Sequence, residues 1–461
     1  MMLKIAFRSI FRNARRSLTT LFTIAVGLSA ALVFAAYALY DIYVLQTTAV
    51  ERGGHLTVFA KGYFDFGSGD PAIWGIADYS GVLRLITSDP EIARMAAVVT
   101  PVQFLGGIAE NPANGGSRTF FATGFVPNDQ AHMHGWNEYG IGTGLENTDL
   151  RSDDSSKGVI GFGFARYLGL CAALHLRDCP SAPVNAPSRA GKDASSLPPQ
   201  DFSRIAETGT TTDTTPRVNL MAATAGGAPN IVSMEIGRVE KQGAKEMDDG
   251  YVVMNLALAQ QLVYGRGEHK VTGIVLQLHR TEDVPKARAR LQEIFAAHHL
   301  ALEVRDYTEI NDYYGQTINF FRSMFSFIAV LIGVVVLFTV SNTMSMSVME
   351  RIEEIGTTRA LGERRGRIRR QFLLEGAMLG ILGATLGVAL AFVAAAAVNR
   401  AGLSWTPPGD AHPIPLKLYL LGAADVMAAA WAALVLVSTV AALIPANRAA
   451  RMSIVDALRH V

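Results

Sequence analysis

The sequence has little cysteine and almost no excess charge. Its 461 residues include two cysteines, and 41 Lys and Arg stand against 40 Asp and Glu, so that the net charge is +1. Proteins that bind nucleic acid through the phosphate backbone carry a marked basic patch or excess. We therefore expect no nucleic-acid partner.

Sequence motifs of catalysis are also missing. There is no G-x-x-x-x-G-K-[ST] phosphate loop, because Gly191-Lys192 is followed by Asp193, and there is no H-E-x-x-H zinc motif. His132 and His134 are interpreted as surface histidines, and no Ser or Cys nucleophile motif stands out. We expect a chain that is not itself an enzyme and that binds no metal or cofactor.

Long apolar runs are present instead. Each approaches or exceeds the ~20 residues that a helix needs to cross a bilayer, and backbone groups in lipid must bond within the segment, which favours helices. The runs are Leu18–Leu45, Phe320–Val340, Ala377–Val398 and Val426–Ile444. Four buried helices of a soluble core are the less favoured alternative. The first run continues beyond the 7–15 apolar residues of a signal peptide, so we interpret it as an uncleaved anchor.

Basic residues predict the orientation, because Lys and Arg accumulate on the cytoplasmic side of membrane helices. They are frequent in residues 1–17, 348–370 and 446–461 and scarce in residues 399–418. Both termini are therefore predicted to be cytoplasmic in a multi-pass protein, and residues 46–319 to lie outside, in the periplasm of a cell with two membranes.

The predicted fold class is a membrane protein with four transmembrane α-helices and a large mixed α+β extracytoplasmic domain inserted between helices 1 and 2. Its predicted parts are an amphipathic cytoplasmic helix (1–17), transmembrane helix 1 with a stalk extension (18–45), the periplasmic domain (46–319), transmembrane helix 2 (320–347), a cytoplasmic loop (348–370), transmembrane helix 3 (371–398), a short periplasmic loop (399–418), transmembrane helix 4 (419–445) and a cytoplasmic tail (446–461).

Within the external domain, alternating or periodic apolar residues predict strands and helices. The strands are His55–Ala60, Val98–Phe104, Arg118–Val126, Ile231–Val239, Val271–Leu278 and Ala301–Val304, and the helices are Tyr79–Thr87, Met254–Val263 and Val284–Ala297. Residues 180–217 are rich in Pro, Ser, Ala and Thr, which is typical of a mobile insertion. Strands flank it on both sides, so the two halves are expected to pack together.

Both cysteines, Cys171 and Cys179, fall in this external domain, where oxidation is permitted. We predict that they form a disulfide, with two free thiols as the alternative, because pairing depends on geometry.

Glycines recur along the third apolar helix. Gly376 and Gly380, and then Gly383 and Gly387, are spaced four residues apart. Small residues at this spacing let helix backbones approach closely in lipid. The spacing predicts tight helix packing without telling whether the neighbour belongs to the same chain.

The loop after the second helix combines apolar and charged residues at helical spacing. Ile352 and Ile355 lie among charged side chains, so a short amphipathic helix is predicted to end near Gly356 and a second to begin near Glu363. The apolar edge could enter a groove on a partner. A basic loop that only fixes topology is the alternative.

This loop resembles the signature E-R-x-x-E-I-G-x-x-R-A-L-G-A of ABC transporter permeases of the MacB/FtsX/LolC type. The matching residues are Glu350, Arg351, Glu354, Ile355, Gly356, Arg359, Ala360, Leu361 and Gly362. Glu363 departs from the usual small residue. The tail 445–459 is similar to the family's P-A-x-x-A-A-x-x-x-P-x-x-A-L-R ending, with Ser453 and Ile454 where the second proline is expected.

The resemblance implies a mechanism. In this family two permease chains pair as a homodimer or heterodimer, and each docks on a cytoplasmic ABC ATPase that binds ATP and Mg²⁺. The coupling helix transmits ATPase motion to the external domains. It corresponds here to residues 350–362, in which Ile352 is also expected to take part. Both lipoprotein release, with a periplasmic lipoprotein carrier, and efflux through a periplasmic adaptor are compatible with this mechanism. The resemblance implies that the chain lies in the lipid of the bacterial inner membrane. An FtsX-like regulator of a cell-envelope hydrolase is the alternative.

Overall fold

The computed structural model describes residues 14–67, 71–141, 148, 150–177, 179, 216–265, 269–406 and 414–452. Most of the predicted helix 1–17, residues 180–215 of the predicted insertion and residues 453–461 of the tail lie outside this range. The chain divides into two compact units. The helical unit comprises residues 1–43, 315–405 and 414–461, and the domain unit comprises residues 44–314 and 406–413.

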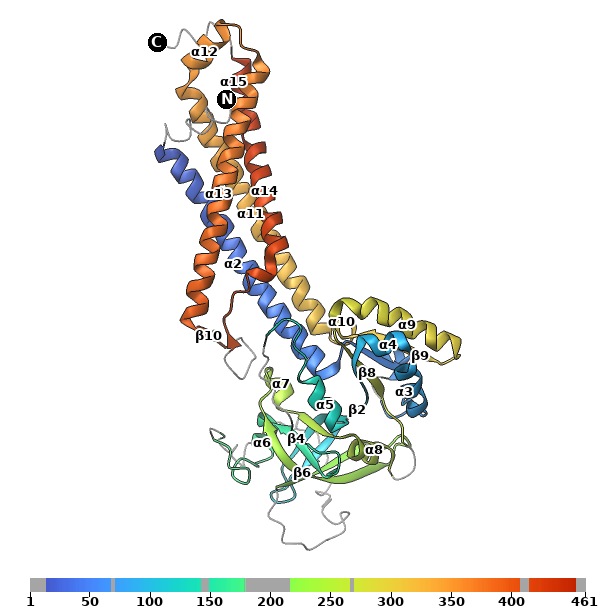
Figure 1. The fold of residues 1–461 in the computed structure, drawn as a ribbon. Helices are drawn as coiled ribbons and strands as arrows, with labels where there is room; N and C mark the ends of the chain where they lie inside the picture. Colours follow the sequence, from blue (N-terminus) through green and yellow to red (C-terminus); the bar gives the residue numbers. More distant parts are fainter. Residues whose placement is uncertain are drawn as a thin grey trace, which may run out of the picture. The chain divides into compact units, whose positions relative to one another are not determined.

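Long helices build the helical unit, and they run side by side in Figure 1. They are α2 (Ala14–Gly53), α11 (Asp312–Glu350), α13 (Arg365–Ala401) and α14 (Ala424–Ala441). Shorter elements are α12 (Ile352–Ala360), η4 (Leu421–Ala423), α15 (Leu443–Arg451) and the strands β10 (Ser404–Trp405) and β11 (Ile414–Pro415). Within the described residues, four helices are long and apolar enough to cross a membrane, which agrees with the four predicted spans.

Two predicted helix boundaries differ from the structure. The boundary predicted between residues 17 and 18 lies inside α2, which already includes residues 14–17. The fourth predicted span, 419–445, is interrupted near its end, because α14 stops at Ala441 and α15 starts at Leu443. Pro445 lacks the N–H that would bond to the carbonyl of Ala441, so the regular bonding of α14 is interrupted, and Pro445 lies in the first turn of α15.

Apolar side chains from these helices form one core. Ile24, Leu28 and Leu32 of α2 are buried with Phe372 and Leu379 of α13. The described surface remains rich in large apolar residues, especially on α11, where Phe327 and Phe338 are exposed. Apolar helices with an apolar outer surface are typical of a membrane environment.

A nine-stranded sheet forms the centre of the domain unit, in the order β3-β7-β4-β6-β5-β2-β8-β1-β9, with a further pairing of β3 and β2. The strands are β1 (Leu56–Ala60), β2 (Ala96–Glu110), β3 (Ser117–Phe125), β4 (Lys157–Gly161), β5 (Arg217–Ala223), β6 (Pro229–Glu240), β7 (Tyr251–Asn255), β8 (Gly273–Leu278) and β9 (Leu302–Asp306).

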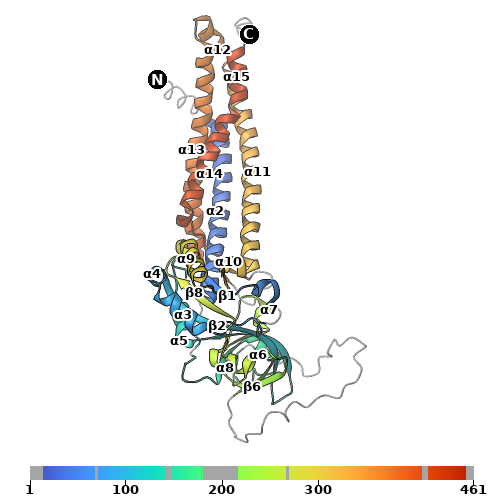
Figure 2. The same cartoon turned by 90° about the vertical axis from the view of Figure 1, so that its right-hand side faces the viewer.

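Strand β2 belongs to two parts of this sheet. Residues 96–102 pair with β8, whereas residues 103–110 pair with β3 and also reach β5. The pairings β2–β3–β7–β4–β6–β5–β2 therefore close into a ring of six strands, while β8, β1 and β9 extend from the other part. In Figure 2, β1 and β8 lie near α9, and β6 lies near α6 and α8. Gly107 permits this crowding, because a Cβ there would lie 2.1 Å from the carbonyl oxygen of Met221.

Short helices cover the sheet. They are η1 (Tyr63–Gly67), α3 (Tyr79–Ser88), α4 (Pro90–Met95), α5 (Pro127–Met133), α6 (Phe162–Tyr167), α7 (Lys245–Asp248), α8 (Leu256–Tyr264), η3 (Thr281–Asp283), α9 (Val284–Ala297) and α10 (Tyr307–Ile310). One apolar core collects residues of the ring and α8. Another joins β1, β8 and β9 to α3, α4 and α9.

Most predicted strands and helices of the domain occur near their predicted positions, and the predicted packing of the two halves is confirmed. Strand β4, which precedes residues 180–217, pairs with β6 and β7, which follow them. The predicted helix Met254–Val263 begins too early. Met254 and Asn255 end β7, and the Asn255 side chain accepts the N–H of Ala257, so the helix starts at Leu256.

Candidate functional site

Helix α12 and the residues on either side of it carry the signature found in the sequence. The helix follows α11 after the single residue Arg351. The prediction that it ends near Gly356 is wrong, because it continues to Ala360. It ends where Gly362 adopts a φ of 93°, with the Gly362 N–H bonded to Arg359 and the Glu363 N–H bonded to Thr358. These two bonds form the glycine-terminated end that satisfies the last carbonyls of a helix.

The inner face of α12 is buried. Arg351, Ile355 and Gly356 lie against the helical unit, and Ile355 shares its apolar core with Ile368 and Phe372. The prediction that the apolar edge enters a groove on a partner is therefore wrong for Ile355, because the chain's own helices already cover it.

The outer face of α12 is polar and exposed. It presents Glu353, Glu354, Thr357 and Thr358. Leu361, directly after the helix, is 88% exposed. Leu361 therefore adds an exposed apolar side chain at the end of this polar face.

Ion pairs fix α12 in place. Arg351 donates to Glu375 of α13 at 2.8 Å, and its Nε lies 3.5 Å from Glu354. Arg359 donates to the carbonyl oxygen of Met452, and Glu350 pairs with Arg16 of α2. These contacts join α12 and its starting residue to α13 and to the residue after α15, and they join the end of α11 to α2.

Sequence reasoning missed Glu375. It is a lone acidic residue at the start of the third apolar helix, between Leu374 and Gly376. An ionisable residue inside a membrane segment is costly and needs a partner. That signal could have identified Glu375, although only the structure pairs it with Arg351.

The predicted packing glycines contact two different helices of the same chain. A Cβ on Gly376 would lie 2.5 Å from Ala442 Cβ, and one on Gly380 would lie 2.8 Å from Ser438 Cβ. A Cβ on Gly383 would meet Ile24, and one on Gly387 would lie 2.9 Å from the carbonyl oxygen of Ala25. Helix α13 thus packs against α14 with its first pair of glycines and against α2 with its second.

Gly376→Ala is expected to destabilise the helical unit by about 1–3 kcal/mol, the usual cost of an overpacked methyl group. Its control is Gly333→Ala in α11, because no atom lies within 4 Å of a Cβ there. That change replaces glycine by a better helix former. Thermal unfolding in mild detergent measures both. Equal melting temperatures for the two variants would contradict the close packing at Gly376.

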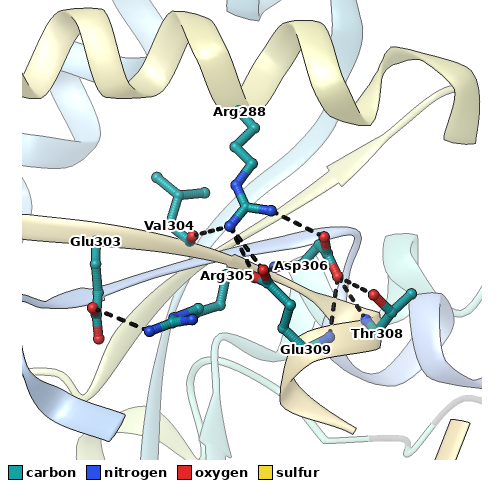
Figure 3. Close-up of polar contacts among 7 residues, drawn as sticks. All are labelled: Arg288, Glu303, Val304, Arg305, Asp306, Thr308 and Glu309. Atoms are coloured by element: carbon teal, nitrogen blue, oxygen red, sulfur yellow. Dashed lines mark hydrogen bonds and ion pairs between the residues drawn. The ribbon is translucent and has the colours of Figure 1, made fainter. Parts of the chain in front are cut away.

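A polar junction lies where the domain passes into α10, shown in Figure 3. Arg288 of α9 donates to Asp306 at 3.2 Å, to the Val304 carbonyl at 3.2 Å and to both oxygens of Glu309 at 3.0 Å. Asp306 also caps α10 through the N–H groups of Thr308 and Glu309. This junction holds the end of β9 and the start of α10 against α9.

A second polar junction surrounds His55, directly after α2. The Leu278 N–H donates to His55 Nδ1 at 3.0 Å, so Nε2 carries the proton and faces Thr281 Oγ1 at 3.2 Å. Thr281 donates to Glu138 at 2.7 Å and accepts from Gln46 of α2 at 3.1 Å. Burial lowers the pKa of His55 to about 4. The neutral imidazole therefore links the end of α2 to β8 and η3.

The strands next to these junctions are neighbours. β1 follows α2, β9 precedes α10 and α11, and Leu56 lies opposite Asp306 in their antiparallel pairing. The two chain segments that join the domain to long helices therefore enter one sheet side by side.

Cys171 and Cys179 are joined by a disulfide, with their Cα atoms 5.7 Å apart. Among the residues that the structure describes, no group of three or more His, Cys, Asp or Glu side chains could hold a metal ion. The residues described above form exposed surfaces and hydrogen-bonded junctions between elements. We assign none of them a catalytic role.

Comparison with known proteins identifies relatives for part of the chain. The FtsX-like permease C-terminal family model matches residues 323–454. The ABC transporter permease YtrF of Bacillus subtilis (strain 168) is 35% identical over 29% of this chain, and the macrolide export ATP-binding/permease protein MacB of Shewanella sp. (strain W3-18-1) is 30% identical over 44%. The lipoprotein-releasing system transmembrane protein LolC of Neisseria meningitidis is 28% identical over 51%.

These matches cover 30%, 30% and 57% of the three relatives' own lengths. The periplasmic region of MacB from Actinobacillus actinomycetemcomitans aligns with 59% of this chain and 95% of its own, at 13% identity and a TM-score of 0.32, which is too weak a likeness to support an inference. The family model and the sequence relatives agree with the signature on α12. Residues 323–454 thus match the FtsX-like permease C-terminal family, and over part of its length the chain is similar to ABC transporter permeases of the MacB/FtsX/LolC type.

Proposed function

We propose that this chain couples ATP hydrolysis by a separate cytoplasmic ABC ATPase to conformational work on the other side of the membrane. The ATPase, with its ATP and Mg²⁺, docks on the outer face of α12. The work serves the release or transport of lipoproteins, or the efflux of a periplasmic or membrane-embedded substrate. The domain unit lies in the periplasm, and both termini lie in the cytoplasm.

The observation that carries the proposal is the two-sided character of α12. Its outer face offers Glu353, Glu354 and Leu361 to a partner, while Arg351 and Ile355 fix its inner face to the helical unit. A docking element that is rigidly held can pass a displacement on to the helices behind it, because packed elements switch between discrete arrangements.

Charge distribution supports the cytoplasmic placement of α12. The turn and the first residues of α13 expose Arg364, Arg365, Arg367, Arg369 and Arg370. Basic residues at the end of a membrane helix favour the cytoplasmic side. With α12 on the cytoplasmic side, our proposal assigns the domain unit, which lies between α2 and α11 in the chain, to the outside.

The exposed surface of α11 is an argument for the presence of a second permease chain. Within the most apolar stretch of α11 only 11% is buried inside this chain, whereas the corresponding share of α2 is 39%. The exposed residues of α11 include Val330, Val334 and Phe338. Lipid or a second permease chain, identical or related, would cover such a surface.

The two cargo classes come from the relatives. One is named for macrolide export and another for lipoprotein release. Both activities belong to proteins that this chain matches only in part, so the choice between them requires a transport assay with each cargo.

Two substitutions, one that reverses a charge and one that replaces an apolar side chain by a charged one, test the docking surface. Glu354→Lys and Leu361→Asp are each expected to reduce at least tenfold the amount of ABC ATPase that copurifies with the chain from its native membranes in mild detergent. The physical reason is the loss of a charge contact and of an apolar anchor. The ATPase is identified by its phosphate-loop peptides in mass spectrometry and by ATP hydrolysis in the purified sample.

Glu282→Lys in the domain unit is the matched control, since the Glu282 side chain is 61% exposed and that of Glu354 is 56% exposed. The control should retain the ATPase at the unsubstituted level. Retention of the ATPase by both α12 variants would contradict docking at this face.

A further inference from the structure

Arg351 occupies an unusual position between two helices. It is the one residue that separates the end of α11 at Glu350 from the start of α12 at Ile352, and its backbone is not helical, with φ −115° and ψ 18°. The backbone direction of α12 relative to α11 therefore depends on this residue. Its side chain, however, is 8% exposed and points into the helical unit.

The Arg351 side chain lies between two carboxylates. Its Nη1 is 2.8 Å from Glu375 of α13, whose side chain is 3% exposed, and its Nε is 3.5 Å from Glu354, whose side chain is 56% exposed. Three charged side chains thus follow one another: Glu354 on the outer face of α12, Arg351 at its start, and the buried Glu375 of α13.

This arrangement differs from the apolar packing beside it. The apolar core that Ile355 shares with Phe372 and Ile368 is held by a non-directional effect, so it sets no bond geometry between α12 and α13. An Arg–carboxylate bond requires a defined geometry. Separation of Arg351 from Glu375 would leave a buried charge without its partner, which is strongly unfavourable.

We propose that Arg351 and Glu375 are positioning residues that make α12 and α13 move as one body. The pair is the joint through which a displacement of the docked helix reaches the third membrane helix. This role rests on the proposed function, in which α12 is the segment that an ATPase displaces.

The test separates this role from a contribution to stability. A buried ion pair can often be replaced by apolar residues of similar volume without loss of stability. The double variant R351M/E375M removes the directional bond while it fills the space, and Arg351→Lys keeps the charge. The matched control is E363M/R367M, which removes a more exposed ion pair between the segment after α12 and the first turn of α13.

Each full-length variant is purified with its bound ATPase, and three quantities are measured: the melting temperature, the ATP hydrolysis rate per bound ATPase, and amide exchange of residues 352–360. R351M/E375M is expected to melt at or above the unsubstituted temperature, to hydrolyse ATP at least tenfold more slowly and to exchange at least tenfold faster in α12. R351K is expected to keep at least half of the hydrolysis rate, and E363M/R367M to match the unsubstituted chain in all three.

Hydrolysis and α12 exchange within twofold of the unsubstituted chain in R351M/E375M would overturn the proposal. If that variant fails to fold, R351K decides, because a loss of hydrolysis without a change in α12 exchange also overturns it. If the unsubstituted chain holds no ATPase, the proposed function fails instead. The exchange of α12 in R351M/E375M and E363M/R367M then still decides whether the joint exists.

Discussion

Asp248→Ala is expected to lower the stability of the domain unit by about 5 kcal/mol, the lower end of the sum for three hydrogen bonds to a charged group at roughly 1.5–3 kcal/mol each. The Asp248 carboxylate is buried and accepts three backbone N–H groups: those of Phe162 and Gln242 at 3.0 Å and that of Gly163 at 2.6 Å. Its loss leaves three donors without their acceptor. The same side chain joins the start of α6 to the segment after β6.

The measurement is urea-induced unfolding of the full chain in detergent, followed by tryptophan fluorescence. A W405F/W431F background leaves Trp74 and Trp136, which both belong to the domain unit. Asp153→Ala is the control, since its side chain is 68% exposed and pairs with Arg151, and exposed pairs contribute about 0–1 kcal/mol. Similar midpoints for the two alanine variants would show that the hydrogen bonds of Asp248 contribute little to the stability of the domain unit.

The second large effect is that the domain unit loses stability in acid because of His55. Its pKa lies at about 4 in the folded domain because the imidazole is buried, whereas the unfolded value is about 6.5. Between these two values the unfolded chain binds a proton that the folded chain does not. His55 therefore contributes its full stabilisation above pH 6.5, and this contribution is lost as the pH falls to about 4.

The expected loss is about 1.4 kcal/mol per pH unit and about 3 kcal/mol in total. The structural reason is that a proton on His55 Nδ1 would face the N–H of Leu278, which now donates to that nitrogen. The junction with Thr281 and Gln46 depends on the same ring. Acid therefore weakens the contact between the domain and the last turns of α2.

His55→Gln removes the titrating group, so the stability of this variant should depend less steeply on pH between 6.5 and 4 than that of the unsubstituted chain. Groups that both proteins share, among them His134 with its pKa lowered by burial to about 4, cancel in the difference. The exposed His298 supplies the control variant His298→Gln. Parallel pH curves for His55→Gln and the unsubstituted chain would contradict the assignment.

Much of the candidate site could be read in the sequence. The signature from Glu350 to Gly362 identified the segment, and the basic residues around it predicted its side of the membrane. Its internal division could not be read in the same way. Ile355 and Leu361 are both large and apolar, yet the first is 6% exposed and the second 88%. The helix phase that distinguishes them depends on where α12 starts and stops.

Hydropathy, charge and local spacing therefore determined the four apolar helices, the residues of the signature and most strands of the domain, because these properties act over a turn of helix or a few residues of strand. The tertiary structure alone decided which groups meet. Arg351 and Glu375 are 24 residues apart, and Gln46 and Thr281 are 235 apart. Each pair forms only when separate elements pack together, and packing depends on side-chain shapes from the whole chain, which no local pattern contains.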